Sequence, residues 1–98
     1  MSDSPNAQSI SRAVILGAGT MGNGIAQVCA QAGMQVVLFD INDDAVATGL
    51  ENIKRMLATA VEKGKASPED VTATMSRLST STDLIASCEG AQLVIEAI

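Results

Sequence analysis

Short apolar runs alternate along the chain with longer segments whose apolar residues recur every three or four positions. The apolar runs are Ala13–Leu16, Gln35–Asp40 and Leu93–Ile98, with Leu78–Ser81 as a shorter candidate strand. Their length and β-branched content are typical of strands buried in a parallel sheet. The segments between them have helical spacing. The expected helices cover residues 21–32, about 43–63, 68–76 and 83–86. This order predicts an α/β fold with right-handed crossovers.

Capping residues mark where these helices begin and end. Ser67 precedes Pro68, a pair typical of an N-cap followed by the first helical residue. Gly33 and Gly64 stand where the first two helices should end, because glycine adopts the left-handed conformation of a C-terminal cap at little cost. The other N-caps stay open: Asn42 or Asp43 for the long helix, and Thr82 or Asp83 for the last short one. Two consecutive helices therefore separate the second and third strands.

The length of 98 residues favours one compact domain. We expect residues 1–11 to form a flexible polar lead-in and residues 12–98 to form the domain. The last apolar run continues to Ile98 without a turn or a polar tail. Because an unpaired apolar strand favours aggregation, we interpret the sequence as the N-terminal part of a longer protein.

Composition argues against several classes of protein. The net charge is −5 with six basic residues and one aromatic residue, which does not suit a nucleic-acid partner. Neither a membrane span nor a targeting signal is present, so we expect a cytoplasmic protein without a membrane partner. The absence of histidine excludes a His general base or a His-ligated metal within these residues. Cys29 and Cys88 lack metal-site spacing and are expected to be buried thiols.

Gly17, Gly19 and Gly22 fit the pattern G-x-G-x-x-G between the first predicted strand and the first predicted helix, and Asp40 ends the second strand. This context indicates dinucleotide binding much more strongly than the glycines alone. Gly17 permits a tight turn, Gly19 lets the backbone approach a pyrophosphate, and Gly22 lets the helix pack closely on the sheet. We interpret Gly24 as a further small residue that permits close helix packing.

The predicted helix start offers a phosphate site that needs no Lys or Arg. The amides of Thr20, Met21 and Gly22 are free at a helix end that carries about half a positive charge. Asp40 would accept hydrogen bonds from the adenosine ribose and repel a 2′-phosphate, which favours NAD over NADP. Two plainer interpretations stay open: the glycines form only a strand–helix turn, and Asp40 is only a solvated strand-end or cap residue.

The stretches GAGTMGNGIAQVCAQAG, VVLFD, VEKGK, RLSTSTDL and LVIEAI together resemble the NAD domain of the 3-hydroxyacyl-CoA dehydrogenases, including bacterial 3-hydroxybutyryl-CoA dehydrogenases. The resemblance covers residues 12–98. It implies a Rossmann-type parallel sheet, incomplete in this chain, with helices on both faces and a helical hairpin between strands 2 and 3. It also implies NAD-dependent interconversion of 3-hydroxyacyl-CoA and 3-oxoacyl-CoA by a homodimer.

The resemblance assigns individual residues as well. The implied cofactor-binding residues are Gly17, Ala18, Gly19, Thr20, Met21, Gly22, Asp40, Ala97 and Ile98. Lys63 matches a lysine that contacts CoA in this family, although a cation near a helix C-terminus is the plainer interpretation. A second CoA-contacting position, a serine in some members, is Met56 here, which leaves that contact in doubt. The family's catalytic residues lie beyond residue 98, so no catalytic or metal-binding residue is expected in this chain.

Three functions therefore remain open at the level of sequence. The first is the NAD-dependent dehydrogenase, of which these 98 residues alone should be inactive. The second is an NAD-binding module or truncated fragment without catalytic activity. The third is another Rossmann oxidoreductase, acting on a different hydroxy acid or using a flavin, against which the VEKGK and STDL stretches argue.

Overall fold

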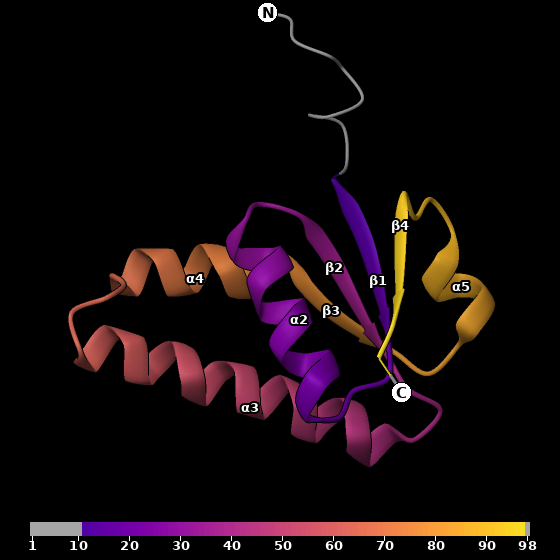
Figure 1. The fold of residues 1–98 in the computed structure, drawn as a ribbon, viewed down its shortest axis with the longest axis horizontal. Helices are drawn as coiled ribbons and strands as arrows, with labels where there is room; N and C mark the ends of the chain where they lie inside the picture. Colours follow the sequence, from indigo (N-terminus) through magenta and orange to yellow (C-terminus); the bar gives the residue numbers. More distant parts are fainter. Residues whose placement is uncertain (1–10, 98) are drawn as a thin grey trace, which may run out of the picture.

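A computed structural model describes residues 11–97 of the chain. These residues form a parallel sheet of four strands in the order β3-β2-β1-β4. The strands are β1 (Arg12–Leu16), β2 (Gln35–Phe39), β3 (Leu78–Ser81) and β4 (Leu93–Glu96). The helices are α2 (Thr20–Gln31), α3 (Asp43–Glu62), α4 (Pro68–Ser76) and α5 (Leu84–Cys88). The predicted order of strands and helices is confirmed (Figure 1).

Helices cover both faces of the sheet, as predicted. The chain crosses from β1 to β2 and on to β3 in one direction, then returns past β1 to β4. Because parallel crossovers are right-handed, the reversal places α5 on the face opposite α2 and α3. Ile15 lies beside Leu38 and Ile95 in the register of the sheet, and these three side chains face the same layer. This is the Rossmann-type arrangement that the sequence predicted.

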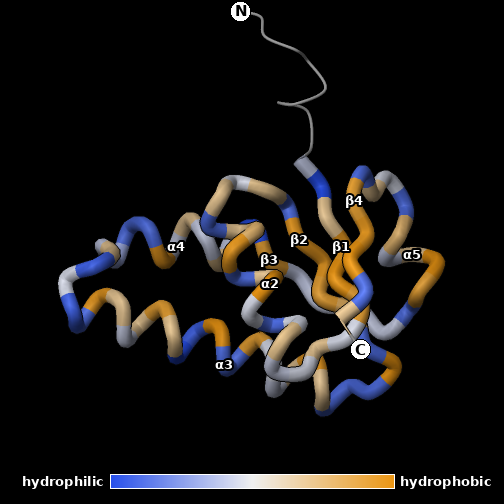
Figure 2. Tube along the Cα trace, viewed as in Figure 1, coloured by the Kyte–Doolittle hydropathy of each residue, from blue (hydrophilic) through white to orange (hydrophobic). Residues whose placement is uncertain are grey.

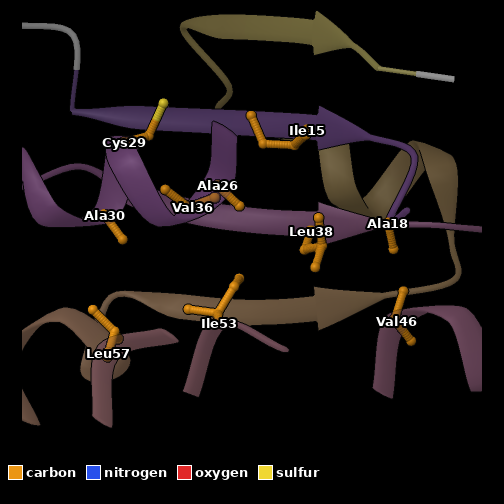
Figure 3. Packing of buried hydrophobic residues seen from close by; sticks show 10 residues of the cluster. All are labelled: Ile15, Ala18, Ala26, Cys29, Ala30, Val36, Leu38, Val46, Ile53 and Leu57. Atoms are coloured by element: carbon orange, nitrogen blue, oxygen red, sulfur yellow. The ribbon is translucent and has the colours of Figure 1, made fainter. Parts of the chain in front are cut away.

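The main core lies between the sheet and the helices α2 and α3. The buried cluster consists of Ile15, Ala18, Ala26, Cys29, Ala30, Val36, Leu38, Val46, Ile53 and Leu57. Figure 3 shows it extending along the sheet, with Cys29 and Leu57 near one end and Ala18 and Val46 near the other. Small residues of α2 bring that helix close to the sheet, whereas larger side chains of α3 fill the layer. The core therefore fixes the starts of both helices against the ends of the strands.

The helices α3 and α4 form the hairpin expected between β2 and β3. Figure 1 shows both helices extending well beyond the edge of the sheet. Ser67 caps α4 in a reciprocal capping box with Asp70, and Gly64 ends α3 with a φ of 73°. Figure 2 shows hydrophobic residues along β1, β2 and β4 and alternating polar and apolar residues along α3. The amphipathic pattern thus determines which side of the hairpin meets the core.

The structure shows which residues are the N-caps of the two helices whose starts the sequence left open. Asn42 is the N-cap of α3, and its side chain accepts hydrogen bonds from the amides of Asp44 and Ala45. Asp83 is the N-cap of α5, which continues to Cys88, beyond the end at Ala86 that we expected. The strand β4 ends at Glu96. No helix among residues 11–97 is long and apolar enough to cross a membrane.

Two predictions about small side chains need correction. Gly24 does not permit close packing, because a Cβ atom there would have no atom within 4 Å apart from its chain neighbours and the backbone of its own helix. Cys29 is buried as predicted, and burial raises the pKa of its thiol, which keeps it protonated and unreactive. Cys88, the last residue of the short helix α5, is only half-buried. Residues 1–10 and Ile98 lie outside the described residues, so the flexible lead-in and the cofactor contact of Ile98 stay predictions.

Candidate cofactor-binding site

In the turn from β1 into α2, the backbone requires glycine at two positions, Gly17 and Gly22. Gly17 has a φ of 110°, a conformation that residues with side chains rarely adopt. Its N–H donates to the carbonyl of Phe39 at 2.8 Å, which ties the turn to the end of β2. A Cβ atom at Gly22 would lie 1.7 Å from the Gly17 carbonyl oxygen. The structure therefore requires glycine at position 22, because the helix approaches the end of β1 closely there, as predicted.

The N-terminus of α2 lacks a side-chain cap. Gly19 is its N-cap and has no side chain to donate or accept, and the first turn holds no acidic residue. The first intrahelical bond runs from Asn23 N to the Gly19 carbonyl. The amides of Thr20, Met21 and Gly22 thus have no acceptor within the helix. The other helices in the described part of the chain are capped by the side chains of Asn42, Ser67 and Asp83.

Space for a ligand lies beside Gly19 and Thr20, at the start of α2. A Cβ atom at Gly19 would meet nothing within 4 Å. A hollow of about 370 Å³ lies there, between the starts of α2 and α3. Its lining residues are Ala18, Gly19, Thr20, Asn23, Asn42, Asp44, Ala45, Thr48 and Asn52. Free N–H donors, a positive helix end and an open surface fit a phosphate group.

Asp40 has a structural role that the motif did not reveal. Its carboxylate accepts from the backbone N–H of Ala18 at 3.1 Å and from that of Asn42 at 3.2 Å. It therefore links the glycine turn to the start of α3. A carboxylate has about four acceptor sites, so two hydrogen bonds leave acceptor capacity for ribose hydroxyls. Asp40 is therefore a structural acceptor, and its role as a ribose ligand stays a prediction.

Ile41 is a candidate that sequence reasoning missed. It is 84% exposed, directly follows Asp40, and lines a hollow of about 190 Å³ with Gly17, Phe39 and Asp40. An isolated apolar side chain on the surface needs no explanation by itself. Its place next to the ribose candidate suits contact with a flat heterocycle. The only signal in the sequence was an isoleucine between two polar residues, Asp40 and Asn42.

The structure brings Ala97 to the same end of the sheet. Its N–H donates to the Leu16 carbonyl at 2.8 Å, and its Cβ lies 3.7 Å from the Cβ position of Gly22. Figure 1 shows the strand ends, the start of α2 and the start of α3 gathered there. In open parallel sheets, ligands bind at the carboxyl ends of the strands. The structure thus brings Ala97 next to the glycine turn, at the end of the sheet where the cofactor is expected.

The two predicted CoA residues lie on the hairpin. Met56 is 56% exposed and lines a hollow of about 380 Å³ with residues of α2 that include Thr20 and Gln27. Lys63 is exposed and forms the C-cap of α3. Since α3 has 20 residues, its far end lies about 30 Å from its start. The structure therefore does not bring Lys63 to the glycine turn, and no group of three or more metal-ligating side chains occurs among residues 11–97.

These features define a dinucleotide-binding α/β domain. The sequence profile described as "3-hydroxyacyl-CoA dehydrogenase, NAD binding domain" matches residues 12–98. The chain belongs to this family, and the prediction of NAD as cofactor is confirmed at the level of the family. The resemblance to the 3-hydroxyacyl-CoA dehydrogenases that the sequence showed is confirmed as well.

Relatives with curated names and solved structures agree with this assignment. A Bacillus subtilis protein named "Probable 3-hydroxybutyryl-CoA dehydrogenase" is 43% identical over 89 residues, which cover 91% of this chain and 31% of that protein. Rat mitochondrial hydroxyacyl-coenzyme A dehydrogenase is 43% identical over 94 residues, covering 91% and 30%. The structure of (S)-3-hydroxybutyryl-CoA dehydrogenase from Ralstonia eutropha matches with a TM-score of 0.86 and 40% identity, covering 91% and 31%. The chain thus spans about a third of the length of these proteins.

Proposed function

We propose that this chain supplies the NAD site of an NAD-dependent 3-hydroxyacyl-CoA dehydrogenase, which interconverts 3-hydroxyacyl-CoA and 3-oxoacyl-CoA. The observation that carries the proposal is the uncapped start of α2, with open space at Gly19 and Asp40 at the end of β2. The names of the relatives favour a CoA thioester as substrate. When bound, NAD supplies the hydride acceptor at its nicotinamide ring. The residues of this chain bind and orient the cofactor.

The pyrophosphate is assigned to the turn Gly17–Gly22. The amides of Thr20, Met21 and Gly22 donate to phosphate oxygens, and the open side of Gly19 admits them. Ala18 offers no free N–H to a phosphate, because its N–H already donates to the Asp40 carboxylate. None of the six basic residues lies between Gly17 and Asp40, so the anion is held by dipoles rather than by side-chain charge.

The adenosine half is assigned to the end of β2. Asp40 accepts from the ribose hydroxyls, and Ile41 provides an apolar contact for the adenine ring. A 2′-phosphate would meet the Asp40 carboxylate at close range, which disfavours NADP. Ala97 and Ile98 are proposed to line the cleft toward the nicotinamide, at the end of β4.

The hairpin is proposed to contact the CoA group. Five of the six basic residues lie between positions 54 and 77, in or beside the hairpin. Lys63 is exposed there and suits a CoA phosphate. Met56 cannot donate a hydrogen bond, so it offers only its apolar side chain to the same ligand. We also propose that the whole protein is a cytoplasmic homodimer.

According to this proposal, the chain binds NAD but does not itself catalyse the dehydrogenase reaction. It has no histidine that could take a proton from the 3-hydroxyl group. We therefore expect no oxidation of NADH with acetoacetyl-CoA by residues 1–98 alone, measured by the loss of NADH absorbance. Turnover by this chain would contradict the division between binding and catalysis. An NAD-binding module without activity is the second candidate, and it is favoured because the chain matches only 31% of the length of its Bacillus subtilis relative.

The location of the cofactor can be tested by NMR of the ¹⁵N-labelled chain. We expect NADH to shift the amide signals of Thr20, Met21 and Gly22 and to leave those of Thr72 and Ser76, on α4, in place. Residues on α4 serve as the internal control because this helix lies on the hairpin. Shifts confined to the hairpin would contradict the assigned site.

A further inference from the structure

The side chain of Asn23 donates a hydrogen bond to the turn that begins α2. It is only 8% exposed and lies inside the helix, where asparagine is a poor helix former. Its Nδ2 donates to the Gly19 carbonyl at 2.9 Å. Its backbone N–H donates to the same oxygen at 2.9 Å. The Gly19 carbonyl thus accepts two hydrogen bonds from one residue.

Holding this carbonyl also orients a donor of the proposed cofactor site. The Gly19 carbonyl and the Thr20 N–H belong to the same trans peptide group, so they point in opposite directions. A carbonyl held toward the helix therefore directs the Thr20 N–H away from the helix at its N-terminal end, and both residues of this peptide line the hollow. Hydrogen bonds accepted by a carbonyl also polarise its peptide group and strengthen the attached N–H as a donor.

Gly19 depends on this support because little else restrains it. It has no side chain, and no atom lies within 4 Å of its Cβ position. No side chain caps the helix at this end. Glycine is also the residue with the most conformational freedom to lose. The extra hydrogen bond from Asn23 is therefore well placed to fix the peptide that faces the ligand.

We propose that Asn23 is a positioning residue of the dinucleotide site: its side chain holds and polarises the Gly19–Thr20 peptide, so that the Thr20 N–H meets a pyrophosphate oxygen. The inference rests on the proposed cofactor site and deepens it. Asn23 acts through Gly19 and needs no contact with the cofactor.

Two variants separate the hydrogen bond from the side chain's shape. Asn23→Ala removes the donor while favouring the helix. Asn23→Ser keeps a donor, because hydroxyl groups of Thr59, Thr72 and Ser87 already donate to the carbonyl four residues earlier in this chain. We expect Asn23→Ala to raise the dissociation constant of NADH about three- to tenfold and Asn23→Ser to stay near the wild-type value. Adenosine, which has no phosphate, should bind all three chains equally.

The NMR spectrum of the ligand-free chain tests the role of Asn23 independently of NADH binding. We expect the ¹⁵N signal of Thr20 to move in Asn23→Ala and to return toward its original position in Asn23→Ser. Equal NADH affinity in all three chains, or equal loss in both variants, would overturn the role of Asn23 while leaving the cofactor site standing. An unmoved Thr20 signal would also overturn it. Failure of the wild-type chain to bind NADH would instead overturn the proposed site itself.

Discussion

Asp40 shows how one carboxylate serves both the fold and the proposed ligand. It accepts from two backbone amides, those of Ala18 and Asn42, and so joins the glycine turn to α3. The ribose assignment uses the acceptor capacity that remains. Changing this residue should therefore have two separable effects, one on stability and one on cofactor choice.

We expect Asp40→Ala to weaken NADH binding about ten- to hundredfold, since a charge-assisted contact contributes about 1.5–3 kcal/mol. NADPH binding should suffer less, because the charge that repels its 2′-phosphate is gone. The ratio of the two dissociation constants, measured by nicotinamide fluorescence, separates this effect from a loss of stability. Asp43→Ala is the control: it removes the same charge from an exposed position nearby. An unchanged ratio in Asp40→Ala would contradict the ribose assignment.

A substitution at Gly19 should weaken cofactor binding without lowering the stability of the free protein. Its φ of −70° suits any residue, and its Cβ position is open. We expect Gly19→Val to fold with a melting temperature close to wild type but to lose at least about tenfold in NADH affinity, because the side chain would occupy the phosphate position. Circular dichroism and an NADH titration measure the two quantities. If a folded Gly19→Val chain bound NADH with wild-type affinity, the assignment of the pyrophosphate to this turn would be wrong.

At the scale of the element, α2 carries two glycines with opposite requirements. Gly22 faces the Gly17 carbonyl, whereas Gly24 faces open space. Both lie inside the helix, so alanine gains the same intrinsic helix propensity at either position. The difference between them is therefore a difference in packing alone.

We expect Gly24→Ala to raise the free energy of unfolding by about 0.5–1 kcal/mol. Gly22→Ala should destabilise the fold, since its Cβ would lie 1.7 Å from backbone oxygen. Chemical denaturation followed by circular dichroism measures both, and each variant is the matched control of the other. Equal effects would show that the packing of α2 against the turn is not as described.

Strands and helices were predictable because local signals determine them. Apolar runs, helical spacing and caps such as Ser67 and Gly64 act within a few residues of sequence. The glycine turn was predictable from its motif. The empty side of Gly24, the two amides at Asp40 and the bond from Asn23 to Gly19 depend on how separate segments meet. No pattern along the chain reports such contacts, and the exposure of Ile41 also became clear only in the fold.

Over the whole molecule, the two proposed anion sites are built differently. The cofactor site has free amides and no basic residue, whereas the hairpin holds most of the chain's positive charge. Lys63 lies at the end of α3 far from the glycine turn, so its contact with CoA should not depend on bound NADH. A chain with a net charge of −5 can thus bind two anionic ligands through local features.

We expect Lys63→Ala to weaken binding of CoA about two- to fivefold, the size of an exposed ionic contact, without changing NADH affinity. Isothermal titration with CoA alone measures the first effect. Lys54→Ala is the control, because Lys54 lies on the same helix and already pairs with Glu51 at 3.8 Å. Equal losses in both variants would show a general effect of charge rather than a contact with Lys63.

The most direct test of the central claim is a titration of the 98-residue chain with NADH and with NADPH, followed by nicotinamide fluorescence. The chain has no Trp or Tyr, so its own emission hardly interferes. We predict saturation by NADH with NADPH binding more weakly, which would establish Gly17–Asp40 as a working NAD half-site. A chain that is folded by circular dichroism yet binds neither dinucleotide would contradict the account.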